Sequence, residues 1–133
     1  MNKIKIELIY ILLLFVSCAS TQNLTKNQII EIAQKYMIEQ GYAEKKLDLN
    51  KTRIDSDILD QYRTTKEIIE SRYNLLNSKA VFLKKIENGW SIGFEYKNEK
   101  FNRIENGIRV GKGLWISENG KEIRMFHENI GFK

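Results

Sequence analysis

The residues that could take part in catalysis are few, and their spacing matches no catalytic pattern. His127 is the only histidine and Cys18 the only cysteine of the 133 residues. A nucleophilic site needs a serine or cysteine beside a base that a carboxylate orients. No spacing connects Ser91 or Glu95 with His127, and a partly exposed histidine at the end of a strand is the simpler interpretation. We therefore expect no enzyme activity and no catalytic residue.

Metal and phosphate sites are not indicated either. A transition-metal site needs several histidine or cysteine ligands, and the chain has one of each. Glycines 107, 111 and 113 lie within a strand pattern, whereas a phosphate-binding loop joins a strand to a helix. Four aspartates lack the spacing of a calcium loop and are interpreted as solvated surface: Asp48, Asp55, Asp57 and Asp60. We expect no metal and no cofactor.

Aromatic and basic side chains are concentrated in the last third of the chain. Tryptophan, tyrosine, phenylalanine and arginine dominate binding hot spots because they bury large, rigid areas. The alternative is that each aromatic side chain belongs to the core. As a protein-binding surface we propose six residues: Phe101, Arg103, Arg109, Trp115, Arg124 and Phe126.

The chain begins with the pattern of an export signal. Lys3 and Lys5 precede the apolar run Leu8–Val16, and small residues follow. This run is much shorter than the roughly 20 residues of a membrane-spanning helix. Residues 1–17 are therefore predicted to be a signal peptide.

The sequence Phe15-Val16-Ser17-Cys18 resembles the lipobox of bacterial lipoproteins. The resemblance implies that Cys18 is lipidated, that it begins a mature chain of 116 residues, and that residues 18–24 form a lipidated tether. Lipidation would also remove a thiol that is reactive in an oxidising compartment. Two alternatives stay open, namely secretion after cleavage behind Ala19 and an uncleaved anchor.

The charge of the mature chain is mildly basic. Loss of Lys3, Lys5 and Glu7 would change the net charge from +5 to +4. This favours an acidic partner or an anionic lipid surface, and it is too diffuse for nucleic acid. By analogy with lipoproteins, the absence of an acidic residue directly after Cys18 favours the outer membrane, facing the periplasm, over the inner membrane.

The stretch Ala80–Lys97 predicts a β-hairpin that turns at Asn88-Gly89, a strong short-range turn signal. After the turn, apolar side chains alternate with small or polar ones, which is the period of a strand with one buried face. Four large side chains share that face: Trp90, Ile92, Phe94 and Tyr96.

Two helices are expected before this hairpin. Thr25 and Gln28 form a capping-box pattern, and the apolar stripe that follows ends at Gly41. A second helix is predicted from about Thr65 to Leu75. Residues 58–76 fit a helical period through Ile58, Tyr62, Thr65, Ile69, Tyr73 and Leu76. Whether they form one helix or two is left open. Between the helices, the alternation Leu47–Leu49 indicates a short strand.

Further strands are expected after the hairpin. Residues 98–107 are predicted to form a polar, basic loop around Phe101. Residues 108–117 read as one strand whose apolar face Lys112 interrupts. Its glycines indicate a bulge or the close approach of another backbone. Residues 118–121 form a turn, and 122–128 a return strand.

This order predicts an α+β domain over residues 25–133, with N-terminal helices packed on one face of an antiparallel sheet of about four strands. The opposite face would be partly open, with Phe82, Trp115 and Phe126 on it.

The layout is similar to two families of small envelope domains. The opening helix IIEIAQKYMIEQGY, the hairpin NGWSIGFEY and the segment GLWISENGKEIRMFH resemble immunity proteins with a nuclear-transport-factor-2-like (cystatin-like) fold. Their last strand often follows an Ile-Ser pair and a glycine turn and ends on histidine, here Ile116-Ser117, Gly120 and His127. PepSY-type domains are the second resemblance.

Neither family implies catalysis. The first resemblance implies that the protein binds and blocks a toxin, and the second that it restrains a protease or acts within an envelope complex. The sequence thus predicts a non-enzymatic envelope lipoprotein that binds a protein partner, as an immunity protein. The alternative is a structural or assembly lipoprotein, or a PepSY-like regulator of an envelope complex.

Overall fold

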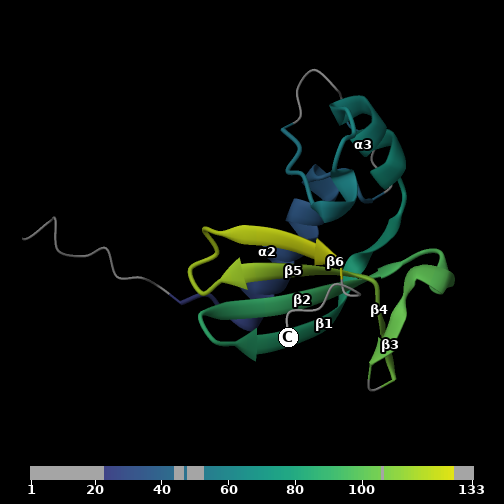
Figure 1. Cartoon of the computed structure of the whole chain (residues 1–133). Helices are drawn as coiled ribbons and strands as arrows, with labels where there is room; N and C mark the ends of the chain where they lie inside the picture. Colours follow the sequence, from purple (N-terminus) through teal and green to yellow (C-terminus); the bar gives the residue numbers. More distant parts are fainter. Residues whose placement is uncertain (1–22, 44–46, 48–52, 106, 128–133) are drawn as a thin grey trace, which may run out of the picture.

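The computed structural model describes residues 23–43, 47, 53–105 and 107–127 (Figure 1). The predicted signal peptide, the predicted lipidation site Cys18 and most of the predicted tether lie outside the described residues. The same holds for Leu49, where part of a short strand was expected, and for Glu128.

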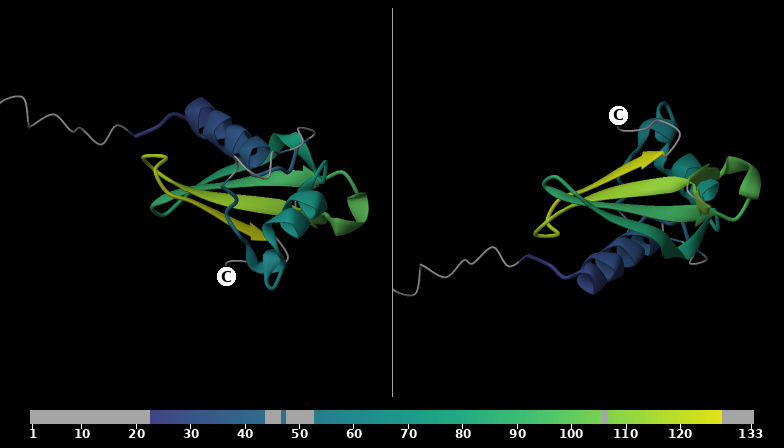
Figure 2. Two further views of the ribbon diagram at one scale, coloured as in Figure 1. Left: turned by 90° about the horizontal axis from the view of Figure 1, so that it is seen from above. Right: turned by 90° about the horizontal axis from the view of Figure 1, so that it is seen from below.

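A four-stranded antiparallel sheet forms the centre of the molecule, with the strand order β1-β2-β5-β6. One helix lies across one face of this sheet, and a second helix lies near its end (Figures 1 and 2). The predicted α+β class, with helices that precede antiparallel strands, is confirmed. The strands of the sheet are β1 (Leu76–Ile86), β2 (Gly89–Tyr96), β5 (Lys112–Ser117) and β6 (Ile123–His127).

Helix α2 (Lys26–Glu39) forms where the capping pattern predicts it. The Thr25 hydroxyl accepts a hydrogen bond from the Gln28 N–H at 3.3 Å, and the Gln28 side chain accepts one from the Thr25 N–H at 2.9 Å. These bonds satisfy donors that a helix start leaves free. The helix ends at Glu39, Gln40 is its C-cap, and Gly41 follows with a φ of 87° that favours glycine.

The predicted hairpin of β1 and β2 forms, but its two-residue turn is Glu87-Asn88, one position before the predicted turn at Asn88-Gly89. Asn88 has a φ of 63°, and Gly89 is already the first residue of β2. A Cβ at Gly89 would overlap the backbone oxygen of Ile116 on the neighbouring strand. The Asn-Gly pair therefore serves two needs, a left-handed turn and a close approach of two strands.

The core lies between α2 and the sheet. All four alternating side chains predicted for β2 are buried in it. Ile92 and Phe94 are completely inaccessible to solvent. The core consists of Ile29, Ala33, Met37, Tyr42, Leu76, Trp90, Ile92, Phe94, Tyr96, Leu114 and Ile116.

The middle segment contains two short helical pieces rather than one helix. These are the 3-10 turn η1 (Ile58–Asp60) and helix α3 (Thr65–Arg72). Helix α3 begins where it was predicted but ends three residues before Leu75. Tyr62, between the two pieces, has a φ of 66°, which a continuous helix does not allow. We call residues 53–73 the cap.

The predicted strand over residues 108–117 is wrong in one respect, because it is two strands. After η2 (Glu99–Phe101), strand β3 (Arg103–Glu105) pairs with β4 (Ile108–Val110) in a separate two-stranded sheet. The segment 98–107 is therefore not only a loop. We call residues 98–110 the arm.

Gly111 separates the arm from β5. A Cβ there would overlap the ring of Tyr96 and the side-chain oxygen of Asn102. The expected close approach exists, and the atoms that a Cβ would meet belong to side chains. The Gly111 N–H donates to the Phe94 oxygen at 2.9 Å.

The molecule has two distinct ends. The Leu24 N–H donates to the Glu118 oxygen at 3.2 Å, so the end of the predicted tether meets the domain at the β5–β6 turn. Gly89 pairs with Ser117, which places the β1–β2 turn at this same tether end. The C-terminus of α2, the cap and the arm lie at the opposite, distal end (Figures 1 and 2). Among the described residues, no helix is long and apolar enough to cross a bilayer.

Candidate partner-binding surface

The structure separates the six predicted binding residues into two groups. Trp115, Arg124 and Phe126 lie on β5 and β6, on the face of the sheet away from α2. Phe101, Arg103 and Arg109 lie on the arm. The six do not form one patch.

The first group partly covers the open face of the sheet. Arg124 pairs with Trp115 across the two strands, and its guanidinium lies 5.3 Å from the centre of the indole ring. The ring of Phe126 lies over Gly113, where a Cβ would overlap it. Trp115, Phe126 and Phe82 are only half-buried, as expected for a partly open face.

The arm exposes more apolar area than this face. Phe101 is 54% exposed, Ile104 69% and Ile108 37%. Arg103 is exposed next to them, on the strand that holds Ile104. Ile104 pairs with Arg109 and Ile108 with Glu105, so the two isoleucines lie on opposite faces of the two-stranded arm. Large apolar side chains that are exposed in this way indicate a site of interaction.

Two sets of contacts fix the arm at its base. The Asn102 amide accepts from the Tyr96 N–H at 2.7 Å and donates to the Tyr96 oxygen at 2.9 Å, and the Phe101 ring meets the Tyr96 ring edge to face. Arg109 lies 2.5 Å from Glu99 and 4.0 Å from Glu95. The arm therefore presents its apolar residues from a held position.

The cap is a second exposed apolar region, which sequence reasoning missed. Ile58, Tyr62 and Tyr73 were predicted on one helical stripe, but all three are exposed, as is Leu59. Tyr62 is fully exposed in a left-handed conformation that costs an aromatic residue free energy. The helical spacing predicted a buried stripe wrongly, because the positive φ of Tyr62 interrupts the helix at that residue.

A buried ionic network holds the cap to the sheet. Asp57 bonds to Lys112 of β5, and Asp60 bonds to Arg72 of α3. The four side chains are at most 4% exposed. This corrects the interpretation of these aspartates as solvated surface. Asp55 is also engaged, since it accepts from the Tyr36 hydroxyl at 2.7 Å.

Arg72 is the centre of this network. Its guanidinium donates to the Gln40 oxygen at 3.2 Å and to the Asp55 backbone oxygen at 2.6 Å, in addition to Asp60. Its Nε has no hydrogen-bond partner, and the Tyr42 ring centre lies 4.7 Å from the guanidinium carbon. One arginine thus connects the end of α2, the cap and α3.

The electrostatics of the network follow from burial and pairing. Burial alone would raise the pKa of Asp57, but the Lys112 ammonium and hydrogen bonds from Lys112 and Leu59 lower that pKa below its ordinary value. Burial lowers the pKa of Lys112, and the Asp57 carboxylate offsets this decrease only in part. Burial also raises the pKa of Tyr42. The charges are paired and inaccessible to solvent, so a structural role fits them better than a catalytic one. We call the two ion pairs, Asp57–Lys112 and Asp60–Arg72, the latch.

One sequence signal could have revealed the latch. Lys112 interrupts an otherwise apolar face of its strand, and a lysine at such a position needs a carboxylate partner if it is buried. The sequence alone did not indicate which aspartate supplies it, because Asp57 lies 55 residues away.

Exposed apolar residues are concentrated at the distal end. Among the described residues, nine large hydrophobic side chains are classed as exposed, and Val81 and Ile86 of β1 are the two outside the cap and the arm. The seven distal ones are Ile58, Leu59, Tyr62, Tyr73, Phe101, Ile104 and Ile108.

Within the described ranges, no three His, Cys, Asp or Glu side chains are grouped so that they could hold a metal ion. Comparisons with protein-family models, with curated proteins and with solved structures found no match.

Proposed function

We propose that this chain is a non-enzymatic, lipid-anchored envelope protein that binds a protein partner with its distal end. The observation that carries the proposal is the concentration of exposed apolar side chains on the cap and the arm, opposite the point where the tether joins. Rigid aromatic side chains such as Tyr62 and Phe101 lose little entropy on binding, which suits them to an interface.

The position of the tether supports a partner that arrives from the aqueous side. If Cys18 carries lipid, the seven residues 18–24 reach at most about 25 Å when fully extended. The β5–β6 turn would then lie close to the membrane, and the cap and arm would point away from it. A surface that lies on lipid would instead be expected at the tether end.

The more specific role that we propose is immunity, in which the partner is a toxin. This rests on the resemblance of the helix and the two hairpins to cystatin-like immunity proteins. A single long helix across a four-stranded antiparallel sheet is compatible with that resemblance. The outer membrane is the proposed location, by the same analogy with lipoproteins.

Affinity capture from cross-linked envelope membranes tests partner binding. The tagged full chain is compared with a double arm variant, Phe101→Ala with Ile104→Ser, and with the matched tether-end variant Ile86→Ser. All three replaced residues are exposed, so each protein should fold. We expect one specific partner whose recovery falls at least ten-fold in the arm variant only. Recovery that is equal in all three, or no partner, would refute the proposal.

Mass spectrometry of the native chain tests the anchor separately. We expect a first residue Cys18 with added acyl groups. An unmodified chain that still starts at Met1 would contradict lipid anchoring without affecting the binding result.

A further inference from the structure

Each face of the arm's two-stranded sheet exposes one isoleucine. Ile104 lies on the same face as Arg109, whereas Ile108 lies on the opposite face, which it shares with Val110. Both isoleucines are classed as exposed. A flat surface that docked on one face of the arm would leave the isoleucine of the other face in water. Burial of both side chains therefore requires a partner that contacts the arm from two sides.

The arm is attached to the main sheet along one strand only. Strand β4 lies against β1 and β2, and a methyl group of its buried Val110 occupies the place where a Cβ at Gly93 would lie. Among the described residues, β3 pairs with β4 alone. The hairpin therefore projects from the end of the main sheet (Figure 1). Its attached base lowers the conformational entropy that is lost when a partner binds.

Two exposed cations flank Phe101 in the sequence at the base of the arm. Within the described ranges, neither Lys100 nor Arg103 forms an ion pair, whereas Arg109 is paired with Glu99. Opposite charges across an interface guide association and exclude wrong partners. The surface that receives the arm is therefore expected to carry carboxylates.

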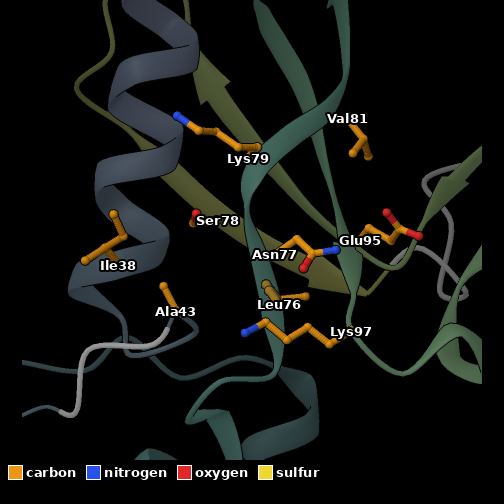
Figure 3. A pocket seen from close by; sticks show the side chains of 9 residues that line it. All are labelled: Ile38, Ala43, Leu76, Asn77, Ser78, Lys79, Val81, Glu95 and Lys97. Carbon is orange, nitrogen blue, oxygen red and sulfur yellow. The ribbon is translucent and has the colours of Figure 1, made fainter.

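The protein's own cleft does not offer this match. An open cleft of about 630 Å³ lies between the C-terminal part of α2 and the beginning of β1, with Ile38 and Leu76 in its apolar part (Figure 3). Lys79 and Lys97 extend to the α2 side of β1, whereas Glu95, the only carboxylate among the described lining residues, extends to the other side (Figure 3). The basic arm of a second copy is therefore poorly matched to this cleft.

We propose that the arm enters an apolar cleft of a different protein, and that the rim of that cleft is acidic. Ile104 and Ile108 would contact opposite walls of the cleft, and Phe101 would lie at its mouth. A carboxylate of the rim would pair with Arg103, whose guanidinium can bond to both carboxylate oxygens. The inference rests on the proposed function, because it specifies the shape and charge of the partner's surface.

Capture with variants of a single face tests the contact with two walls. The tagged full chain is compared with Ile104→Ser, with Ile108→Ser and with the tether-end control Ile86→Ser, all at exposed positions. We expect recovery of the partner to fall about ten-fold or more in each arm variant and to be unchanged in Ile86→Ser. Thermal unfolding at the wild-type temperature confirms that each variant is folded. Loss of the partner in only one of the two arm variants would overturn the proposal.

Charge reversals test the acidic rim. Arg103→Glu lies on the arm, and Lys84→Glu on β1 is its matched control, since both replace an exposed cation. We expect recovery to fall about ten-fold or more for Arg103→Glu, to stay within about two-fold of the wild type for Arg103→Lys, and to be unchanged for Lys84→Glu. Equal recovery with the two reversals would refute the acidic rim.

The outcome can be separated from that of the proposed function. A partner that is lost with the double variant Phe101→Ala and Ile104→Ser but retained with Ile108→Ser would refute the cleft and leave the proposed function standing. Absence of any captured partner would refute both. Concentration-dependent dimerisation of the purified chain that Ile104→Ser and Ile108→Ser both abolish would show that a second copy receives the arm, and would overturn the assignment to a different protein.

Discussion

Lys112 shows how one side chain decides the position of a distant segment. Its neighbours on the core side of β5, Leu114 and Ile116, are completely buried, and Lys112 is equally buried. Its ammonium bonds to Asp57, whose other oxygen accepts from the Leu59 N–H at 2.8 Å. A buried charge without such a partner would be costly.

Removal of one member of this pair should therefore be strongly destabilising. We expect Asp57→Ala to lower the free energy of unfolding by about 3–5 kcal/mol, because Lys112 would stay buried without a counter-charge. Urea denaturation measures this. The double variant Asp57→Leu with Lys112→Met should recover most of the loss, and a double variant as unstable as the single one would contradict this explanation.

The same pair predicts a response to acid. Because the folded-state pKa of Asp57 lies below its ordinary value of 3.8, its carboxylate contributes stability above about pH 4. That contribution is lost as the pH falls through the lowered folded-state value. Urea midpoints between pH 6 and pH 2 should therefore fall more steeply in the wild type than in Asp57→Asn. Parallel curves would exclude Asp57 as a source of acid sensitivity.

The backbone conformation of Tyr62 costs folding free energy, and its exposed side chain makes no packing contact with a described residue that would offset this cost. Its side chain is fully exposed and its φ is 66°, a conformation that costs a residue with a Cβ about 1–2 kcal/mol. Tyr62→Gly should therefore raise the free energy of unfolding by about 0.5–1 kcal/mol, after the greater freedom of glycine in the unfolded chain is subtracted.

Tyr62→Ala is the matched control, because alanine keeps the Cβ and pays the same conformational cost. Its stability should equal that of the wild type within about 0.5 kcal/mol. If both variants are destabilised, Tyr62 makes a stabilising contact and its display to a partner loses support.

At the scale of elements, the features that could be predicted from the sequence are those that depend on residues close together in the chain. Thr25 and Gln28 predicted the start of α2, and Asn88-Gly89 predicted the first hairpin, although its turn lies one residue earlier, at Glu87-Asn88. These signals depend on residues at most three positions apart. The core face of β2 followed from its alternation for the same reason.

The arrangements that depend on distant contacts were not predicted, although helix α3 of the cap was. The cap is held through Asp57 and Lys112, which are far apart in the sequence, and its exposed apolar residues imitate a buried helical stripe. The break at Gly111 depends on the position of the Tyr96 ring. Of the candidate binding residues, Phe101 and Arg103 are exposed on the arm, whereas Trp115 and Phe126 partly cover the sheet.

The cap should open as a unit when its latch is weakened. Asp60→Asn removes the charge that faces Arg72 but keeps the shape of the side chain. We expect amide hydrogen exchange at residues 57–72 to accelerate at least ten-fold, while β2 and β5 keep their protection. Uniform acceleration across the sheet would mean that the network stabilises the whole domain and is not a local latch.

At the scale of the whole molecule, the sheet separates two ends with different surfaces. Leu24, the last residue of the predicted tether, is bonded to the β5–β6 turn, and the exposed apolar residues lie mainly on the cap and the arm. The cleft between α2 and β1 opens at the same distal end. The account therefore depends on one arrangement, in which the protein is held at one end and binds its partner at the other.

Photo-crosslinking in living cells tests this arrangement most directly. A photoreactive phenylalanine analogue is placed at Phe101 or Tyr62 at the distal end, and at Ile86 at the tether end, all of which are exposed. Both distal positions should crosslink to one and the same protein, and Ile86 should not. Adducts from Ile86 alone, or no protein adduct from either distal position, would contradict the account.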